Sequence, residues 1–353
     1  MSKIAVIGAG KTGRGFIGRL LQESGKEIFF IDKNEELVRT LNEEKKFEVH
    51  FFGNVRETYT VSGFEACTWE NADLSEIELV LVSVGGQNLT EVGERLSTLL
   101  NRERKIYVIT AENASQPSKI LKQAIGLSNV YVSESTVFCT TIENSGLNIL
   151  SENYPYLQYN ADLLEGYLPD TEKLKPIRNF SDFLTRKLYT YNAASCVIAY
   201  LGWTKGYTNY ADAANDPEIL ELLDKNYEVT NRVLCKEFGY EQKDQREFAA
   251  LSKAKFCDRT IVDTIARNAR DPQRKLADKE RIMGPIRLLH QYGEDASVLE
   301  KTAAAAILYD ADEQWQKLKS GKTEEEILIE FCGLNPEECA YQNIKKYMEA
   351  LKR

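Results

Sequence analysis

Residues 3–18 read KIAVIGAGKTGRGFIG, and this stretch decides the fold. An apolar strand over 3–7 is followed by glycines with G-x-G-x-x-G spacing, at Gly8, Gly10 and Gly13. The first glycine permits a sharp turn, the second lets the backbone approach a pyrophosphate, and the third lets the following helix pack on the strand. The free N–H groups at the start of that helix suit a doubly charged diphosphate. The stretch therefore predicts a dinucleotide-binding turn.

An acidic residue at the end of the next strand supports this prediction. A helical segment over 14–24 leads into an apolar strand over 27–32, which ends in Asp32, 19 residues after Gly13. A carboxylate there can accept hydrogen bonds from the adenosine ribose hydroxyls and repels a 2′-phosphate, which favours NAD over NADP. Lys33 follows directly and reduces this discrimination slightly. The alternative is a glycine turn in another kind of α/β protein.

The composition is that of an ordinary globular protein with two domains. The chain has 353 residues, of which 43 % are hydrophobic and 28 % are charged. That length is too great for one typical domain. The net charge of −9 argues against a nucleic-acid-binding surface. A local basic pocket for an anionic substrate stays compatible with it.

Compartment and metal content are also predicted from the residues. The chain enters its first strand at once, and no apolar run reaches the length of a membrane span. The seven cysteines are scattered without a C-x-x-C pair, which is typical of reduced thiols, so we expect a cytoplasmic protein. The two histidines, His50 and His290, are far apart in sequence, so neither a metal site nor a Ser-His-Asp triad is indicated.

The organisation along the chain predicts two domains of different class. Strands are predicted over 3–7, 27–32, 79–84 and 106–110, and helices over 14–24, 34–44 and 89–101. Such alternation predicts an α/β Rossmann-type doubly wound sheet, with a β-rich insertion over 46–64. Helical periodicity dominates from about residue 180, after a candidate linker over 168–176. We therefore expect an NAD-binding domain over 1–180 and an all-helical substrate and catalytic domain over 181–353.

Residues at the ends of two further strands are expected to face the cofactor. Ser83 and Val84 end the strand predicted over 79–84, Gly85 follows it, and Asn113 follows the next strand. Alternatively, Gly85 serves only a turn and Asn113 caps a helix. The predicted cofactor-binding residues are Gly8, Gly10, Lys11, Thr12, Gly13, Asp32, Ser83, Val84 and Gly85.

The second informative stretch is 186–202, RKLYTYNAASCVIAYLG, which predicts a largely buried helix with a few polar groups. At about 100° per residue, Ser195 lies roughly 80° and Asn192 roughly 140° around the helix from Lys187. All three can line one wide side of a cleft. A buried lysine has a lowered pKa and can act as a general base, and an asparagine amide can donate to an alkoxide. The alternative is a solvated lysine and an asparagine satisfied within the core.

These motifs together resemble the polyol-specific long-chain dehydrogenases, and within them the enzymes of mannitol 1-phosphate. The resemblance runs nearly end to end. It is carried by GAGKTGRGFIG (8–18), FEVH (47–50), VSG (61–63), RKLYTYN (186–192), PQRKL (272–276) and residues 307–309.

The resemblance implies roles for particular residues. Lys187 would be the general acid/base at C5 of the sugar, and Asn192 and Asn113 would hold the alkoxide oxygen, without a metal. Four basic residues would bind the phosphate: Arg274 and Lys275, together with Arg267 and Arg270. The alternative for these four is a set of surface charges on an exposed helix.

Two positions depart from the family pattern. Ser195 stands where the family has a histidine, and Phe138 and Cys139 align with an Asp-Arg pair. The prediction is NAD-dependent interconversion of fructose 6-phosphate and mannitol 1-phosphate. Another polyol or a uronate is an alternative, and so is another two-domain dehydrogenase in which Asn192 has no role. A catalytically silent NAD-binding protein also stays open, as do a monomer and a homodimer.

Overall fold

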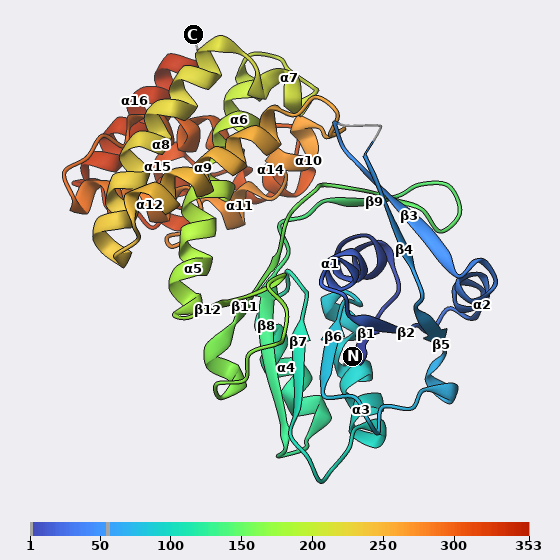
Figure 1. The fold of residues 1–353 in the computed structure, drawn as a ribbon. Coiled ribbons are helices and arrows are strands. Elements are labelled where there is room, and N and C mark those ends of the chain that lie inside the picture. The colour runs from blue at the N-terminus through green and yellow to red at the C-terminus, as the bar shows by residue number, and fades with distance from the viewer. Residues whose placement is uncertain (1–2, 54–56, 353) are drawn as a thin grey trace. The chain divides into compact units, whose positions relative to one another are not determined.

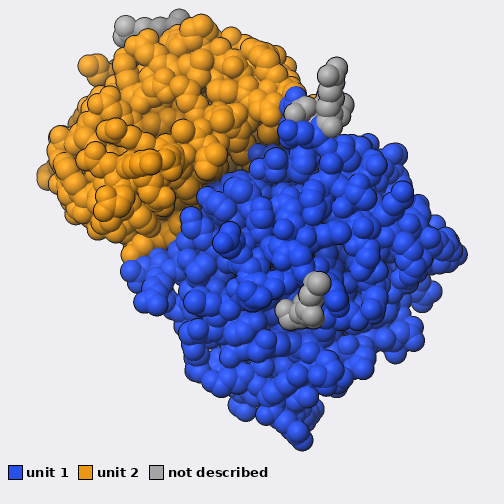
Figure 2. All heavy atoms as spheres, viewed as in Figure 1, with its two compact units in different colours: residues 1–181 blue, residues 182–353 orange. Residues whose placement is uncertain are grey.

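The chain forms two compact units, residues 1–181 and 182–353 (Figure 2). The computed structural model describes residues 3–53 and 57–352. The division lies one residue from the boundary predicted from the sequence. Each unit has its own hydrophobic core.

The first unit is built on an eight-stranded sheet of order β12-β11-β8-β7-β6-β1-β2-β5 (Figure 1). Its strands are β1 (Lys3–Ile7), β2 (Glu27–Ile31), β5 (Glu65–Cys67), β6 (Leu79–Val82), β7 (Ile106–Thr110), β8 (Val130–Thr136), β11 (Leu157–Asn160) and β12 (Leu174–Ile177). Neighbours from β5 to β8 pair in parallel, and β11 joins β8 antiparallel. The strand order reverses between β1 and β6, which is where doubly wound sheets bind ligands at the carboxyl ends of their strands. The predicted Rossmann-type sheet is confirmed.

Both faces of this sheet are covered by helices. In β1, Ile4 and Val6 belong to one core, whereas Ala5 and Ile7 belong to the other, because successive side chains point to opposite faces. The helices of this unit are η1 (Gly13–Gly18), α1 (Arg19–Glu23), α2 (Glu35–Glu44), α3 (Leu89–Leu99) and α4 (Pro117–Ile125), with short 3₁₀ turns η2 (Trp69–Asn71), η3 (Gly86–Asn88) and η4 (Ala161–Leu164). Helices η1 and α1 pack on the face of Ile4, and α3 and α4 on the face of Ala5. Burial on both faces explains why the strands are continuously apolar.

A second sheet of four strands packs over the start of the first helix. Its order is β4-β3-β10-β9, with β3 (Lys46–Phe51), β4 (Thr58–Ser62), β9 (Thr141–Glu143) and β10 (Ile149–Ser151). The predicted β-rich segment 46–64 supplies β3 and β4; its residues 54–56 lie outside the described residues. Figure 1 shows η1 and α1 between the two sheets. A Cβ added at Gly15 would lie 2.2 Å from the Ile149 side chain, so the glycine permits this close packing.

The linker predicted over 168–176 is wrong in part, because it ends in a strand. Strand β12 begins at Leu174 and pairs in parallel with β11. Pro176 lies inside this strand, and proline is tolerated there because β12 is at the edge of the sheet.

The second unit is helical. Its elements are α5 (Phe180–Lys187, which begins at the end of the first unit), η5 (Leu188–Asn192), α6 (Ala193–Thr204), α7 (Tyr210–Ala214), α8 (Pro217–Phe238), α9 (Gln242–Cys257), α10 (Ile265–Ala269), α11 (Pro272–Lys275), α12 (Met283–Gln291), α13 (Ser297–Leu308), α14 (Glu313–Lys319), α15 (Glu324–Glu330) and α16 (Cys339–Leu351). Its described residues, 182–352, contain no strand beyond one isolated bridge between Asn209 and Thr264. The predicted all-α second half is confirmed.

Two segments depart from the predicted regular α-helices. Both η1 and η5 are π-helical, with hydrogen bonds from residue i to residue i+5. In η5 the N–H of Ala193 donates to the carbonyl of Leu188. The turn of about 100° per residue expected across 187–192 therefore does not hold, because a π turn takes more residues than an α turn.

Candidate active site

The glycine turn follows β1 and packs against Ser83, the residue after β6. The N–H of Ser83 donates to the carbonyl of Ile7 at 2.8 Å. Gly8 has φ +94°, and a Cβ there would lie 2.1 Å from the Ser83 carbonyl oxygen. A Cβ at Gly13 would lie 1.9 Å from the carbonyl oxygen of Gly8. The first and third glycines of the motif are thus required by the protein's own backbone.

The second glycine is different. Among the described residues, no atom outside the two chain neighbours of Gly10 lies within 4 Å of a Cβ added there, and the φ of Gly10 lies outside the left-handed region. The protein's own packing therefore does not require a glycine at this position. Close approach of a ligand diphosphate does require one. The residues present fit a dinucleotide at this turn.

Asp32 is held at the turn by backbone donors. The Ala9 N–H donates to Asp32 Oδ2 at 2.7 Å, and the Asn34 N–H donates to Oδ1 at 2.9 Å. Each carboxylate oxygen has further acceptor capacity. The half-buried side chain therefore keeps lone pairs for ribose hydroxyls beside the turn.

The remaining predicted cofactor residues of the turn differ in exposure. Lys11 is exposed, whereas Thr12 is half-buried with its hydroxyl 3.2 Å from that of Thr141 in β9. Arg14, which is buried, donates to the carbonyls of Ala9 and Leu147, so it ties the turn to the loop between β9 and β10.

Glu112 orders the loop after β6, and the sequence prediction missed it. Its Oε1 accepts from the N–H groups of Val84 at 2.6 Å and Gly85 at 2.8 Å. Burial raises the pKa of this carboxyl, and the two backbone donors oppose the rise. Gly85 adopts φ +85°, a backbone conformation of this loop that favours glycine. The only sequence signal for Glu112 is its place directly before Asn113.

Asn113 is exposed, and its amide pairs with the backbone of Val137. Nδ2 donates to the Val137 carbonyl at 3.0 Å, and Oδ1 accepts from the Val137 N–H at 3.1 Å. One hydrogen on Nδ2 is not used by these two bonds. Asn113 is not the N-cap of α4, since Gln116 occupies that position. Its predicted role at an alkoxide stays a prediction.

Phe138 and Cys139, at the departure from the family pattern, are buried in the first unit. Phe138 stacks on Tyr154, with ring centroids 5.4 Å apart, and Cys139 Sγ lies 3.2 Å from Ser151 Oγ. An apolar pair here serves packing, which explains how the fold accommodates the change.

In the second unit, Lys187 is the last residue of α5. Burial, together with the nearby charges of Lys255 and Arg281, lowers the pKa of Lys187 to about 7. The residue as a whole is half-buried, so the effect reflects the surroundings of its ammonium end. A lysine with such a pKa exchanges protons near neutral pH, as a general acid or base must.

The π-helical segment η5 separates Lys187 from Asn192 by one turn. Hydrogen bonds in this segment join residues five apart, so each residue turns the chain through a smaller angle than in an α-helix. The angle around the helix axis between Lys187 and Asn192 is therefore smaller than the 140° expected for an α-helix. Asn192 is half-buried, and it precedes the buried helix α6.

Ser195 lies on the first turn of α6 and is half-buried. The Tyr210 hydroxyl, from the buried side of α7, donates to Ser195 Oγ at 3.1 Å. Ser195 therefore keeps its own hydroxyl proton for donation to another group. This hydrogen bond could not be predicted from the sequence, because the two residues are on different helices.

The four predicted phosphate-binding residues have different surroundings. Arg267 pairs with Asp263 at 2.9 Å, and Arg274 pairs with Asp271 at 2.6 Å. Both arginine side chains are exposed. Lys275 is buried, donates to the Asn268 carbonyl and lies 5.5 Å from the centre of the Tyr200 ring.

Lys275 lies close to two other cations. Burial lowers its pKa to about 8, and the charges of Arg281 and Arg274 act in the same direction. Arg281 thus lies near both Lys187 and Lys275, and the sequence prediction missed it. Arg270 is exposed beside a separate cavity of about 180 Å³ lined by Trp315.

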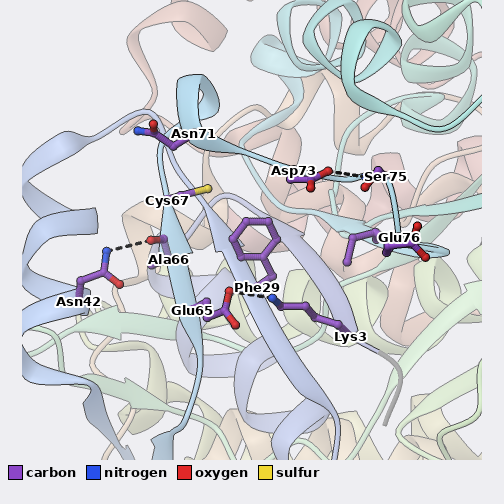
Figure 3. Close-up of a pocket in the computed structure, with 11 residues that line it drawn as sticks. Lys3, Phe29, Asn42, Glu65, Ala66, Cys67, Asn71, Asp73, Ser75 and Glu76 are labelled. Carbon is purple, nitrogen blue, oxygen red and sulfur yellow. Dashed lines mark hydrogen bonds and ion pairs between the residues drawn. The ribbon is translucent and has the colours of Figure 1, made fainter.

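A larger cavity, of about 490 Å³, lies where β1 and β5 begin, away from the glycine turn (Figure 3). Figure 3 shows Lys3 pointing to Glu65, with which it forms an ion pair of 2.7 Å, and Asn42 pointing to the Ala66 carbonyl. Each of these polar groups therefore has a partner within the lining of the cavity.

Residues 3–53 and 57–352 contain no group of three or more His, Cys, Asp or Glu side chains that could hold a metal ion, and metal independence stays a prediction. No helix in this described part of the chain is long and apolar enough to cross a membrane.

Comparison with known proteins identifies relatives over nearly the whole chain. Mannitol-1-phosphate 5-dehydrogenase of Bacillus licheniformis is 28 % identical, over 97 % of this chain and 98 % of the relative. The protein of the same name from Podospora anserina is 27 % identical, over 97 % of this chain and 95 % of the relative.

Solved structures share the fold. A substrate-free D-sorbitol dehydrogenase matches with a TM-score of 0.79 at 13 % identity, covering 99 % of this chain and 93 % of that one. Mannitol 2-dehydrogenase of Pseudomonas fluorescens, in complex with NAD and D-mannitol, matches with a TM-score of 0.64 at 14 % identity, covering 100 % of this chain and 90 % of that one.

Two family models match the two halves of the chain. Residues 2–142 match the mannitol dehydrogenase Rossmann domain, and residues 179–325 match the mannitol dehydrogenase C-terminal domain. These matches confirm the predicted resemblance to polyol dehydrogenases. The chain therefore belongs to the mannitol dehydrogenase family.

Proposed function

We propose that this protein is an NAD-dependent dehydrogenase that interconverts mannitol 1-phosphate and fructose 6-phosphate. The observation that carries the proposal is Lys187, with a pKa of about 7, one π-helical turn before Asn192. A catalytically silent protein has no use for a lysine whose pKa lies near neutral pH, since burying a lysine opposes folding. The names of the relatives from B. licheniformis and P. anserina support the same reaction.

The glycine turn and Asp32 are the proposed cofactor site. The backbone at Gly10 would take the diphosphate, and Asp32 would accept hydrogen bonds from the ribose hydroxyls. NAD, when bound, supplies the acceptor for hydride. The P. fluorescens neighbour, solved with NAD, supports this choice of cofactor.

Side chains of the second unit would move the proton. In alcohol oxidation, the neutral amine of Lys187 takes the hydroxyl proton at C5, the C–H bond breaks as hydride leaves, and the C=O bond forms. The amide of Asn192 donates to the oxygen as negative charge develops on it. Ser195, held by Tyr210, donates a second hydrogen bond where other family members have a histidine.

A phosphorylated substrate is proposed because basic groups gather in the second unit. Arg274 and Lys275 supply positive charge, and Arg281 lies close to Lys275. A guanidinium can bind two phosphate oxygens at once, which favours a phosphate over a hydroxyl. Arg267 and Arg270 remain candidates for the same role.

The test is NADH oxidation, followed by absorbance, with fructose 6-phosphate, fructose and tagaturonate in parallel. We expect rapid turnover with fructose 6-phosphate only. Turnover with fructose or tagaturonate alone would instead assign another substrate within the family. NADH binding without turnover of any of these substrates would favour a catalytically silent NAD-binding protein.

The cofactor preference depends on the charge of Asp32. In Asp32→Asn, an oxygen is still present to accept from the Ala9 N–H, but the charge is lost. We expect the KM for NADH to rise by about ten- to a hundredfold, the effect of a lost charge-assisted hydrogen bond, and turnover with NADPH to increase relative to NADH. Steady-state kinetics with both cofactors measure this. An unchanged KM for NADH would show that Asp32 does not contact the ribose.

We also propose a cytoplasmic protein that is a monomer or a homodimer. The scattered cysteines support a reducing compartment. Light scattering coupled to size-exclusion chromatography distinguishes a mass of 40.1 kDa from twice that value.

A further inference from the structure

A buried amide in the second unit contacts the segment that carries Lys187. Gln245 of α9 is fully buried. Its Nε2 donates to Thr190 Oγ1 at 3.1 Å and to Asn231 Oδ1 at 2.8 Å, and its Oε1 accepts from Arg186 Nε at 2.6 Å. One side chain thus joins the end of α5, the middle of η5 and helix α8.

The partners of Gln245 are themselves fixed. Arg186 is buried between the rings of Tyr240 and Phe248, whose centroids lie 4.4 Å and 4.3 Å from its guanidinium carbon. It also pairs with Asp244, the residue before Gln245, at 2.8 Å. Thr190 is fully buried within the π-helical segment. A strong charged anchor therefore stands directly before Lys187, and a hydrogen bond holds the segment three residues later.

A π-helical turn needs such support. The π conformation is rare, occurs mostly as a single turn within an α-helix, and frequently lies at a functional site. Rarely populated backbone states persist only where the surroundings determine them. Relaxation of η5 to an α-helix would turn Asn192 away from Lys187, to roughly 140° around the axis.

We propose that Gln245 is a positioning residue, which holds η5 in the π conformation so that Lys187 and Asn192 act on the same oxygen atom. This inference rests on the proposed dehydrogenase function for its kinetic consequence. Its structural consequence is independent of any substrate.

Four variants test the proposal. Gln245→Met keeps the length of the side chain but removes all three hydrogen bonds, and Thr190→Val removes only the one to η5. Gln245→Glu is the conservative variant, because the Thr190 hydroxyl and the Asn231 amide can both turn to donate to a carboxylate. Ser252→Ala is the matched control: it removes another buried hydrogen bond between α9 and α8, to Tyr227, that does not reach η5.

We expect kcat for the reduction of fructose 6-phosphate to fall about tenfold in Thr190→Val, the size of one lost buried hydrogen bond, and at least as much in Gln245→Met, which loses three. The KM for NADH stays unchanged in both, and Gln245→Glu recovers most of the activity. Ser252→Ala keeps the parental kcat. Parental kcat in folded Thr190→Val would overturn the kinetic part, as would an equal loss in Ser252→Ala.

Hydrogen exchange of the peptide over 186–195 provides the readout that needs no substrate. We expect its amides to exchange faster in Gln245→Met and Thr190→Val than in the parent and in Ser252→Ala. Unchanged exchange in folded Thr190→Val overturns the positioning role. Faster exchange in a protein that turns over no sugar phosphate would uphold the positioning role and reject the proposed function. If Gln245→Met does not fold, Thr190→Val alone decides.

Discussion

Lys187→Met is expected to lower kcat/KM for fructose 6-phosphate by about 10²- to 10⁴-fold, the usual contribution of a positioned general acid or base. In the proposed mechanism the ammonium of Lys187 gives its proton to the ketone oxygen during reduction, and methionine has no proton to give. The KM for NADH is expected to stay the same, since the glycine turn is unchanged. Steady-state kinetics at saturating NADH measure the loss. A fall of less than tenfold would contradict the assignment of Lys187.

The pH dependence has a definite sign. The pKa of Lys187 lies at about 7, so the group is protonated below that pH and neutral above it. Ketone reduction needs the protonated form and therefore falls as the pH rises through 7, whereas alcohol oxidation needs the neutral form and rises. Lys187→Met should abolish both changes. Identical pH profiles in the parent and the variant would assign the titration to another group.

Lys255→Met is the matched control for this prediction. The positive charge of Lys255 helps to lower the pKa of Lys187, so its removal raises that pKa. We expect this variant to keep turnover while the midpoint of its pH profile moves to higher pH. A variant that loses turnover without such a move would indicate another role for Lys255.

Stability separates a chemical loss from misfolding. The folded pKa of Lys187 lies below its ordinary value of 10.5, so the folded state binds fewer protons than the unfolded state between these two values. This lysine therefore opposes folding, fully below pH 7 and less as the pH rises toward 10.5. Lys187→Met should melt at the same temperature as the parent or higher at neutral pH. A lower melting temperature would mean that the side chain has a structural role.

Local sequence was sufficient to predict the first part of the fold. The period of the apolar residues located β1 and β2, and the glycine spacing located the turn between them, because both depend on neighbours along the chain. The position of Asp32 at the end of β2 could be predicted from the length of one β–α–β unit. Its carboxylate indeed lies against the turn, bonded to the Ala9 N–H.

Features set by distant packing were not predictable. Nothing in residues 188–192 distinguishes a π-helix from an α-helix, since the contacts that hold it come from Gln245, some 55 residues later. Strand β12 was missed for a similar reason: its proline argues against a strand, and only its place at the sheet edge makes it acceptable. In the small sheet, the pairing of β3 with β10 joins segments about a hundred residues apart, so local sequence does not predict it.

Candidate site residues could be proposed from the sequence where they stand in a motif. Lys187 and Asn192 stand in a stretch with a recognisable pattern. Glu112, Arg281 and Tyr210 instead interact with residues that are distant from them in the sequence. Their partners, such as the N–H groups of Val84 and Gly85, become visible only in the folded chain. Residues that contact a candidate site from other elements therefore leave weaker sequence signals than residues that stand within a motif.

The glycines of the turn give the second large effect. In Gly13→Ala the new Cβ would lie 1.9 Å from the Gly8 carbonyl oxygen, which is backbone and cannot rotate away. The turn must open, at an expected cost of about 1–3 kcal/mol or more for overpacking. We expect a lower melting temperature and no measurable NADH binding, by thermal unfolding and fluorescence titration.

Gly10→Ala is the comparison that isolates the cofactor. Its Cβ would meet no atom of the described residues beyond its chain neighbours within 4 Å, and its φ lies outside the left-handed region, so this variant should fold and melt as the parent does. The methyl group would nevertheless occupy the position where a diphosphate approaches the backbone, so NADH should bind at least tenfold more weakly, a loss of about 1.4 kcal/mol. Parental NADH affinity in Gly10→Ala would contradict the proposed position of the diphosphate. Because one glycine is required by the protein and the other by its ligand, a melting temperature lowered only in Gly13→Ala and an affinity lowered in both would separate the two requirements.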